Sequence, residues 1–155
     1  MTDPTPDPPP EKLVFQIYVR ATPEQVWEAI TETSFRRQYF YGSTIESTFE
    51  VGSPVRSHSP EGELWGDDVV LECEPPHLLV HSWRSLWNPE AADEPPSRVT
   101  WRVEAHETGS TRLTVVHDQL EQSPLTAAGV SGGWMFIISG LKTVLETGAP
   151  LADPS

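Results

Sequence analysis

The chain has 155 residues, which suffices for one domain of ordinary size but not for two. Its formal net charge of −13 disfavours nucleic acid and anionic lipid surfaces as partners, because both attract positively charged proteins. The only basic pair, Arg36-Arg37, is interpreted as a solvated helix end. Cys73 is the single cysteine, so an internal disulfide is excluded. With no N-terminal apolar leader and no apolar run of about 18 residues, we expect a cytoplasmic protein without membrane insertion.

Both ends of the chain have the composition of disordered segments. Residues 1–10 consist mainly of Pro, Asp and Thr without apolar periodicity, so burial cannot offset the entropy lost on ordering them. Residues 149–155 are of the same kind. We therefore expect a disordered leader at 1–10, one folded domain at 11–148 and a disordered tail at 149–155.

The first elements are a strand and two short helices. Residues 12–20 alternate between apolar and polar side chains, which is the pattern of a half-buried strand. Thr22 and Gln25 then form a capping-box pattern with proline at the first helical position. Apolar residues at helical spacing follow, and they predict helices at 23–31 and at about 33–38.

Six further strands are predicted in the middle of the chain, because β-branched and aromatic residues alternate there with turn-forming clusters. Their expected ranges are 43–50, 54–59, 63–74, 78–86, 97–107 and 111–119. The short connections favour antiparallel neighbours. One connection, residues 87–96, is long, acidic and rich in Pro and Ala.

The last element is a helix predicted at 134–147, with apolar residues on one wide face and a stop signal at Gly148. Ser123-Pro124 and the glycine-rich segment 129–133 are expected to interrupt the chain before it. The order of the elements predicts an α+β fold. In this fold a curved antiparallel sheet of about seven strands wraps around the long C-terminal helix, with two short helices after the first strand.

Three segments carry a resemblance to a known family: VRATPEQVW at 19–27, VVLECEPPHLLVHSW at 69–83 and GWMFIISGLKTVLETG at 133–148. They resemble the START-like superfamily (also called SRPBCC, or birch-pollen-allergen-like), and within it the branch named for the activator of heat shock protein 90 ATPase. The resemblance implies a helix-grip fold whose hollow between sheet and helix binds lipids, sterols, polyketides or other apolar molecules. It implies no shared reaction, since relatives include aromatases, cyclases, carriers and a stimulator of a chaperone ATPase.

Residues 129–133 formally match one catalytic motif, G-x-S-x-G. A nucleophile elbow also needs a preceding strand and a later His, and the chain offers neither around Ser131. Ser131 is therefore interpreted as a helix N-cap in a glycine-rich hinge.

Two further patterns concern a metal site and a pair of carboxylates. Cys73, His77 and His81 are spaced four residues apart, which on one helix would let them face a common metal ion. Pro75-Pro76 excludes such a helix. Cys73 and His81 could still be neighbours across a hairpin. Asp67 and Asp68 are adjacent on a strand, so they should point to opposite faces; either could orient a ligand. We expect no metal and no cofactor.

The aromatic residues are the most informative feature of the sequence. Tryptophans lie on three predicted strands and at the start of the last helix, where they could form an apolar wall with indole N–H groups to fix a polar end of a guest. The residues expected to line this cavity are Tyr41, Trp65, Trp83, Val99, Trp101, Val115, His117, Trp134, Ile138 and Leu141. Segments 87–96 and 129–133 would form a flexible rim. Whether the rings leave a cavity or fill it stays open.

Three functions follow in order of preference. The first is non-catalytic binding of a small apolar ligand (lipid-, polyketide- or aromatic-like) between the sheet and the C-terminal helix. The second is a chaperone-linked or other protein-interaction module, suggested by the family resemblance. The third is a cyclase- or hydrolase-type enzyme. Its candidate catalytic residues are His58, His81, His117, Asp67 and Tyr41. The oligomeric state is not predicted.

Overall fold

The computed structural model describes residues 11–152 of the chain. In chain order the elements are β1 (Leu13–Val19), α1 (Pro23–Thr31), α2 (Thr33–Tyr39), β2 (Thr44–Glu46), β3 (Pro54–His58), β4 (Leu64–Glu74), β5 (Leu78–Trp83), β6 (Ser97–Ala105), β7 (Thr111–Asp118) and α3 (Pro124–Thr147). The expected leader at 1–10 and the last three residues of the expected tail lie outside the described residues.

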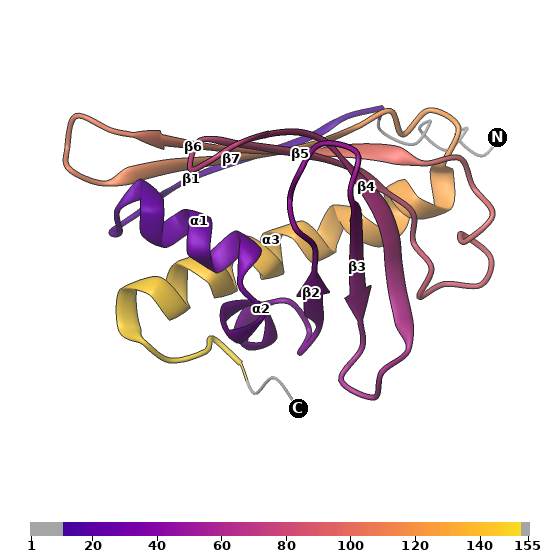
Figure 1. Ribbon diagram of the computed structural model, residues 1–155, viewed down its shortest axis with the longest axis horizontal. Helices are drawn as coiled ribbons and strands as arrows, with labels where there is room; N and C mark the ends of the chain where they lie inside the picture. Colours follow the sequence, from indigo (N-terminus) through magenta and orange to yellow (C-terminus); the bar gives the residue numbers. More distant parts are fainter. Residues whose placement is uncertain (1–10, 153–155) are drawn as a thin grey trace, which may run out of the picture.

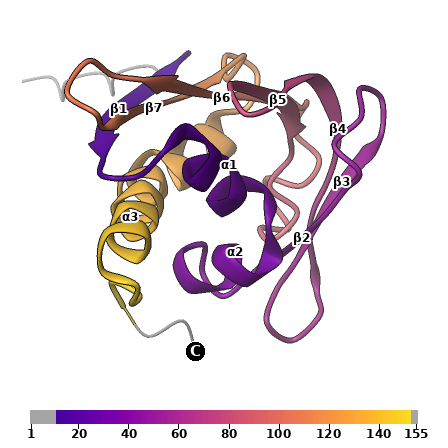
Figure 2. The same cartoon turned by 60° about the vertical axis from the view of Figure 1, so that its left-hand side comes forward.

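One seven-stranded antiparallel sheet has the order β1-β7-β6-β5-β4-β3-β2, so hairpins join neighbours from β2 to β7 and β1 closes against β7. Figures 1 and 2 show that the sheet curves and that α3 lies on its concave side, with α1 and α2 beside it. The predicted α+β helix-grip fold is confirmed. The strand bounds are also close to the expected ones, except that β2 is much shorter than 43–50.

Two irregularities in β4 bend the sheet. The register with β5 shifts between Val70 and Glu72, and the register with β3 shifts opposite Ser57 and His58. Bulges of this kind bend a strand and increase its twist. Gly66 lies at the second irregularity, where an added Cβ would be 2.7 Å from the Ser57 Oγ atom. The end of the sheet formed by β2, β3 and half of β4 can therefore turn down beside the helices (Figure 2).

The capping box of α1 is present as predicted. The Thr22 Oγ1 atom accepts a hydrogen bond of 3.1 Å from the Gln25 backbone N–H, and the Gln25 side chain accepts one of 2.8 Å from the Thr22 N–H. These bonds satisfy two of the free donors at the helix start. The tight connection from β1 into α1 is thereby fixed by the local sequence.

Helix α3 begins ten residues earlier than predicted, at Pro124, so the expected break at 129–133 is wrong. The helix start is capped from outside: the Glu94 carboxylate accepts hydrogen bonds of 2.9 Å and 2.8 Å from the N–H groups of Leu125 and Thr126. A carboxylate at this end also interacts favourably with the helix dipole. Ser131 lies inside the helix, not at an N-cap, and its hydroxyl donates to the Ala128 carbonyl at 3.2 Å.

With 24 residues, α3 is long and apolar enough to cross a membrane by length and composition, contrary to our expectation that the chain holds no such segment. Its apolar face, with Trp134, Ile138 and Leu141 buried, packs into the concave side of the sheet. The core helix of a soluble domain has these properties as well. The fold is that of a soluble domain.

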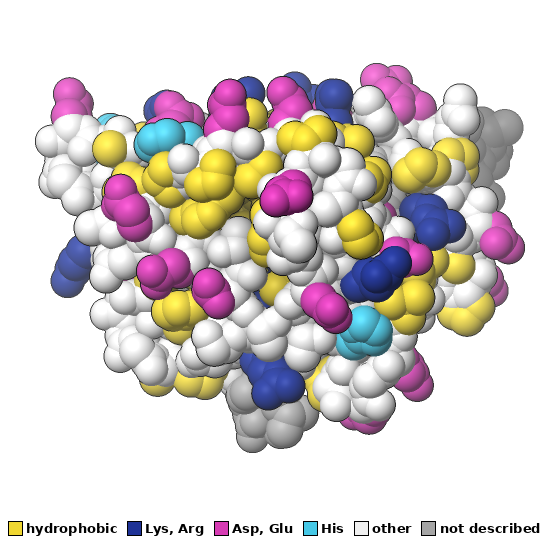
Figure 3. Space-filling model, in the orientation of Figure 1, with side chains coloured by type: hydrophobic (Ala, Val, Ile, Leu, Met, Phe, Trp, Pro, Cys, Tyr) yellow, Lys and Arg dark blue, Asp and Glu magenta, His cyan; other side chains and the backbone are white. Residues whose placement is uncertain are grey.

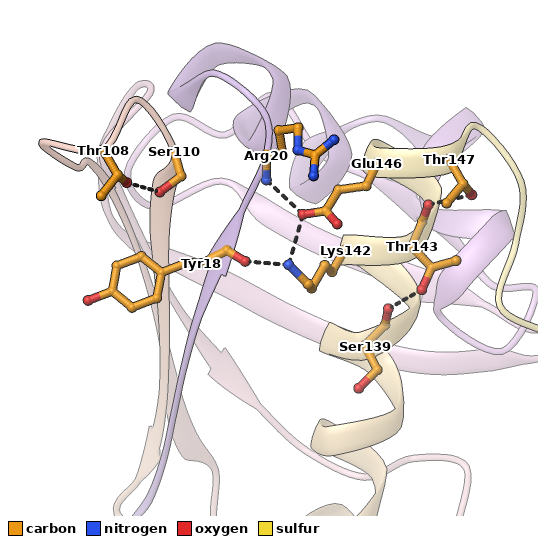
Figure 4. A network of polar contacts seen from close by, with 9 residues as sticks. All are labelled: Tyr18, Arg20, Thr108, Ser110, Ser139, Lys142, Thr143, Glu146 and Thr147. Carbon is orange, nitrogen blue, oxygen red and sulfur yellow. Dashed lines mark hydrogen bonds and ion pairs between the residues drawn. The ribbon is translucent and has the colours of Figure 1, made fainter.

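The C-terminal half of α3 is bonded to the edge of the sheet through the network in Figure 4. The Lys142 ammonium donates to the Tyr18 carbonyl at 2.7 Å and pairs with the Glu146 carboxylate at 2.8 Å. Glu146 also accepts a bond of 2.8 Å from the Arg20 backbone N–H. The pKa of Glu146 is lowered by these bonds to Lys142 and Arg20. The network joins this half of α3 to β1 and to the turn that follows it.

Helices α2 and α3 approach closely at Gly140. A Cβ atom added there would lie 3.0 Å from the Tyr39 Cβ atom. The Tyr39 hydroxyl in turn donates a hydrogen bond to the Ala29 carbonyl of α1. Tyr39 therefore connects all three helices, and it sets where the end of α2 lies relative to the sheet.

Two glycines of α3 test this contact. Gly132→Ala should raise the free energy of unfolding by about 0.5–1 kcal/mol, because alanine favours helix and the new methyl group meets no atom within 4 Å. Gly140→Ala has the same propensity gain but presses on Tyr39, so we expect it to be less stable than Gly132→Ala by about 1–2 kcal/mol. Urea unfolding measures both values. Equal stabilisation of the two variants would contradict the close approach.

Candidate ligand-binding site

A cavity of about 400 Å³ lies between the bent end of the sheet, the end of α2 and the N-terminal half of α3. Its aromatic lining consists of Phe40, Tyr41, Trp65, Trp83, Trp87 and Trp134. Its aliphatic lining consists of Ile45, Val55, Val130 and Ile137. Its polar lining consists of Arg36, Ser43, Ser57, Asp68, His81 and Arg84. The site thus combines a mainly apolar wall with a few polar groups, as ligand pockets commonly do.

Only some of the ten residues expected to line the cavity do so in the structure. Four of them do so: Tyr41, Trp65, Trp83 and Trp134. The other six are buried in the core instead: Val99, Trp101, Val115, His117, Ile138 and Leu141. The reason is that α3 packs directly on β6 and β7, where the Trp101 and Trp134 rings fill the space with centroids 5.4 Å apart. The cavity opens only where the sheet bends away from the helix.

Two buried histidines act as acceptors for indole N–H groups. The Trp134 Nε1–H donates to His117 Nδ1 at 3.0 Å, and the Trp101 Nε1–H donates to His81 Nε2 at 3.1 Å. Because those ring nitrogens accept, the other nitrogen of each ring carries the proton. His117 Nε2–H then donates to the Ser97 hydroxyl at 2.7 Å, and His81 Nδ1–H donates to the Ser82 carbonyl at 2.8 Å. Both imidazoles are fully bonded.

Burial keeps both imidazoles neutral. It lowers the pKa of His117 to about 3 and the pKa of His81 to about 4. A neighbouring charge acts in the same direction, because the Arg36 guanidinium further disfavours a proton on His81. At neutral pH the two rings therefore position Trp101 and Trp134, and His81 presents a neutral face to the cavity.

The two adjacent aspartates point to opposite faces of β4, as predicted. Asp67 pairs on the outer face with Arg56 at 3.3 Å, whereas Asp68 lines the cavity. Burial raises the pKa of Asp68 to about 7, although a hydrogen bond of 3.2 Å from the Ser82 hydroxyl favours the charged form. Asp68 is thus the lining carboxyl group that titrates near neutral pH.

Arg36 is not a solvated helix end, in contrast to our interpretation of the basic pair. Its neighbour Arg37 is exposed, but Arg36 is only 4% exposed and lines the cavity. Its guanidinium carbon lies 3.8 Å from the centre of the Phe40 ring. The sequence gives no signal for this difference, because it depends on how α2 is placed by Tyr39.

The rim of the cavity is built from the long loop and from α3. Trp87 packs on Gly129, where an added Cβ would be 2.9 Å from the indole Cη2 atom. The same loop is fixed to the helix start by Glu94 and by a bond of 2.7 Å from the Ser123 hydroxyl to the Pro95 carbonyl. Tyr41, whose backbone φ is 55°, stacks on Phe136 at 5.5 Å on another part of the rim. Residues 129–133, which were expected to be a flexible part of the rim, are helical.

The candidate metal ligands do not converge. Cys73 pairs with Leu79 across the hairpin and His81 pairs with Val70, so the idea that Cys73 and His81 are cross-strand neighbours is wrong. His77 Nδ1 lies 3.1 Å from the Val103 carbonyl. Within residues 11–152 no group of three His, Cys, Asp or Glu side chains could hold a metal ion.

Comparisons with known proteins agree with this architecture. Among solved structures, DynU16, a protein of the dynemicin biosynthetic locus, is 24% identical with a TM-score of 0.72, over 92% of this chain and 49% of DynU16. CalU16 from Micromonospora echinospora is 22% identical with a TM-score of 0.69, over 90% of this chain and 76% of CalU16. The Aha1 dimer from Colwellia psychrerythraea is 18% identical with a TM-score of 0.69, over 88% of this chain and 97% of the Aha1 chain.

At these identities the solved structures show a shared fold, and this chain spans about half the length of DynU16. A search of curated proteins finds no match. A family model, in contrast, covers most of the chain: the model described as Activator of Hsp90 ATPase homolog 1-like protein matches residues 20–146. The chain therefore belongs to the family of Activator of Hsp90 ATPase homolog 1-like proteins, within the START-like superfamily.

Proposed function

We propose that the protein binds a small apolar molecule, of lipid, polyketide or aromatic type, in the cavity between the bent sheet and α3, and that it does so without transforming it. The observation that carries this proposal is the cavity of about 400 Å³ with six aromatic side chains in its wall. Burial of apolar surface contributes about 25 cal/mol per Å², so a guest of modest size could bind at micromolar strength.

Two further observations support a small-molecule role. Well-formed pockets of this size and apolar character are the usual sites of small ligands. The structurally similar DynU16 belongs to a biosynthetic locus, which is a setting of small-molecule chemistry.

We place the protein in the cytoplasm on the grounds of its soluble-domain fold and single unpaired cysteine.

The enzyme alternative has weaker support in the cavity. Of the five candidate catalytic residues, Tyr41 and His81 line the cavity, whereas His58, His117 and Asp67 do not. Both ring nitrogens of His81 already have partners, so His81 lacks a free site for a proton. Asp68 has a pKa suited to proton transfer, but a second free titratable group beside it is needed for acid–base catalysis.

A protein-interaction role is the second candidate, and one surface feature favours it. Tyr41, Phe136 and Leu151 are exposed and line a second hollow, which shares Tyr41 and Trp65 with the cavity. Such neighbouring exposed apolar residues often mark an interaction site. Stimulation of a heat shock protein 90 ATPase that is lost in Phe136→Glu would support this role, and stimulation unaffected by that substitution would exclude this surface.

The titrating groups of the site predict how stability depends on pH. His81 and His117 have folded pKa values below the unfolded value, so their contribution to stability is present above about pH 6.5 and is lost as pH falls through about 4 for His81 and about 3 for His117. Asp68 has a folded pKa above the unfolded value, so its contribution is present at low pH and is lost as pH rises through 7. The two effects oppose each other between pH 4 and 6.5.

Asp68→Asn removes the contribution of the Asp68 carboxyl group to this pH dependence. Relative to the wild type, the variant should gain about 1–3 kcal/mol of unfolding free energy at pH 8, and the gain should disappear towards pH 4. Urea unfolding followed by tryptophan fluorescence at several pH values measures the difference. Asp67→Asn, on the outer face of the same strand, is the matched control. A gain that does not change with pH would contradict burial of the Asp68 carboxyl group.

A substitution that fills the cavity tests the binding proposal. Val130→Phe places a phenyl ring in the cavity wall, so affinity for the neutral fluorescent probe N-phenyl-1-naphthylamine should fall at least about tenfold. Leu125→Phe, at an exposed position of the same helix, should leave affinity unchanged. Circular dichroism checks that both variants fold. Probe affinity that is equal in wild type and Val130→Phe would exclude this cavity as the binding site.

A further inference from the structure

Arg36 is a buried cation without a counter-ion. Only 4% of the residue is exposed, and its side chain forms no hydrogen bond or ion pair with any of residues 11–152. The Nε atom is completely enclosed and has no hydrogen-bond partner among them. Its guanidinium carbon lies over the face of the Phe40 ring, 3.8 Å from the ring centre. Burial lowers the pKa of Arg36, yet an arginine stays charged in proteins.

Such an arrangement is energetically unfavourable unless a partner compensates for it. Buried charges are ordinarily paired, and buried donors are ordinarily bonded, because a lone buried ion loses its hydration without compensation. The other charged groups of the cavity do not supply the missing partner. Asp68 interacts with Ser82 and Arg84, and the groups that shift its pKa do not include Arg36. The cavity therefore contains a cation that has no hydrogen-bond or ion-pair partner among residues 11–152.

The position of Arg36 points to the guest as this partner. The guanidinium lies over Phe40, and the Phe40 ring is 6.4 Å from that of Trp83 and 6.1 Å from that of Trp134. An anion bonded to Arg36 would thus have its apolar part beside the aromatic wall. A guanidinium offers parallel N–H groups that match the two oxygens of a carboxylate.

We propose that the molecule bound in the cavity is an apolar acid, whose single anionic group, a carboxylate or a group of like geometry, pairs with Arg36. This inference rests on the proposed function, since it specifies the guest of the same cavity. The rest of the molecule does not favour anions. The net charge is −13, and carboxylate side chains are spread over the face shown in Figure 3. A preference for an anion would therefore originate locally, at Arg36, rather than from the overall field.

Two probes with the same aromatic framework test the proposal. The probe 1-anilinonaphthalene-8-sulfonate carries one anionic group, and N-phenyl-1-naphthylamine lacks it. Wild-type protein should bind the anionic probe more tightly than the neutral one. Arg36→Met keeps the length of the side chain. It should weaken the affinity for the anionic probe by about tenfold to a hundredfold and change the affinity for the neutral probe by less than about threefold.

Matched variants separate the pairing from general effects of charge. Arg37→Met removes the same charge from the exposed neighbouring position and should leave both affinities unchanged. Arg36→Lys keeps the charge but not the paired N–H groups, so it should retain part of the preference for the anion and serves also if Arg36→Met fails to fold.

Three outcomes would overturn the inference. The first is a wild-type protein that binds the neutral probe as well as the anionic one. The second is an equal loss of affinity for the anionic probe in Arg36→Met and Arg37→Met, which would indicate an effect of overall charge. The third is a loss in Arg84→Met but not in Arg36→Met, which would place the anion elsewhere in the cavity. Failure of the neutral probe to bind at all would instead count against the proposed function.

Discussion

The pairing of Trp134 with His117 is the interaction on which the structure depends most. A tryptophan 1% exposed between a helix and a sheet must find an acceptor for its N–H group, and His117 of β7 supplies it at 3.0 Å. This bond requires α3 to lie on the concave face of the sheet, with the start of its apolar stripe opposite β7. Lys142 and Glu146 then fix the other end of the helix to β1.

The cavity follows from this placement together with the bend in the sheet. α3 packs on β6 and β7 through Trp134, whereas β4 is irregular at two places and β3 and β2 turn down beside the helices (Figure 2). Space therefore opens between the N-terminal half of α3 and the bent end of the sheet. Residues on the inner face of β4 and β5, such as Asp68 and His81, come to line this space.

Local sequence patterns predicted the parts of the fold that depend on local interactions. The capping box at Thr22, the alternation that separates Asp67 from Asp68, and the hairpin order of the strands all follow from short-range geometry. The start of α3 could not be predicted in this way, because its cap comes from Glu94, 31 residues before Leu125. A proline and several glycines therefore indicated a break where tertiary contacts maintain a helix.

The candidate site was predicted only in part, for a related reason. Alternation shows which face of a strand points inward, but not how far along the sheet the helix covers that face. Val99, Trp101 and Val115 do face inward, yet they lie where α3 fills the space. Arg36 was missed because a pair of arginines at a helix end usually faces solvent. Its burial depends on the packing of Tyr39 against α3, which no local pattern encodes.

The indole N–H resonances of the six tryptophans offer the most direct test of the cavity as a binding site. In nitrogen-15 spectra recorded during titration with N-phenyl-1-naphthylamine, the indole signals of the lining residues Trp65, Trp83, Trp87 and Trp134 should shift together. The signal of Trp27, on α1, should not move. Saturable shifts confined to the lining tryptophans are the predicted result. A titration that leaves the lining tryptophans unchanged, or that shifts Trp27 as much as Trp83, would contradict the account.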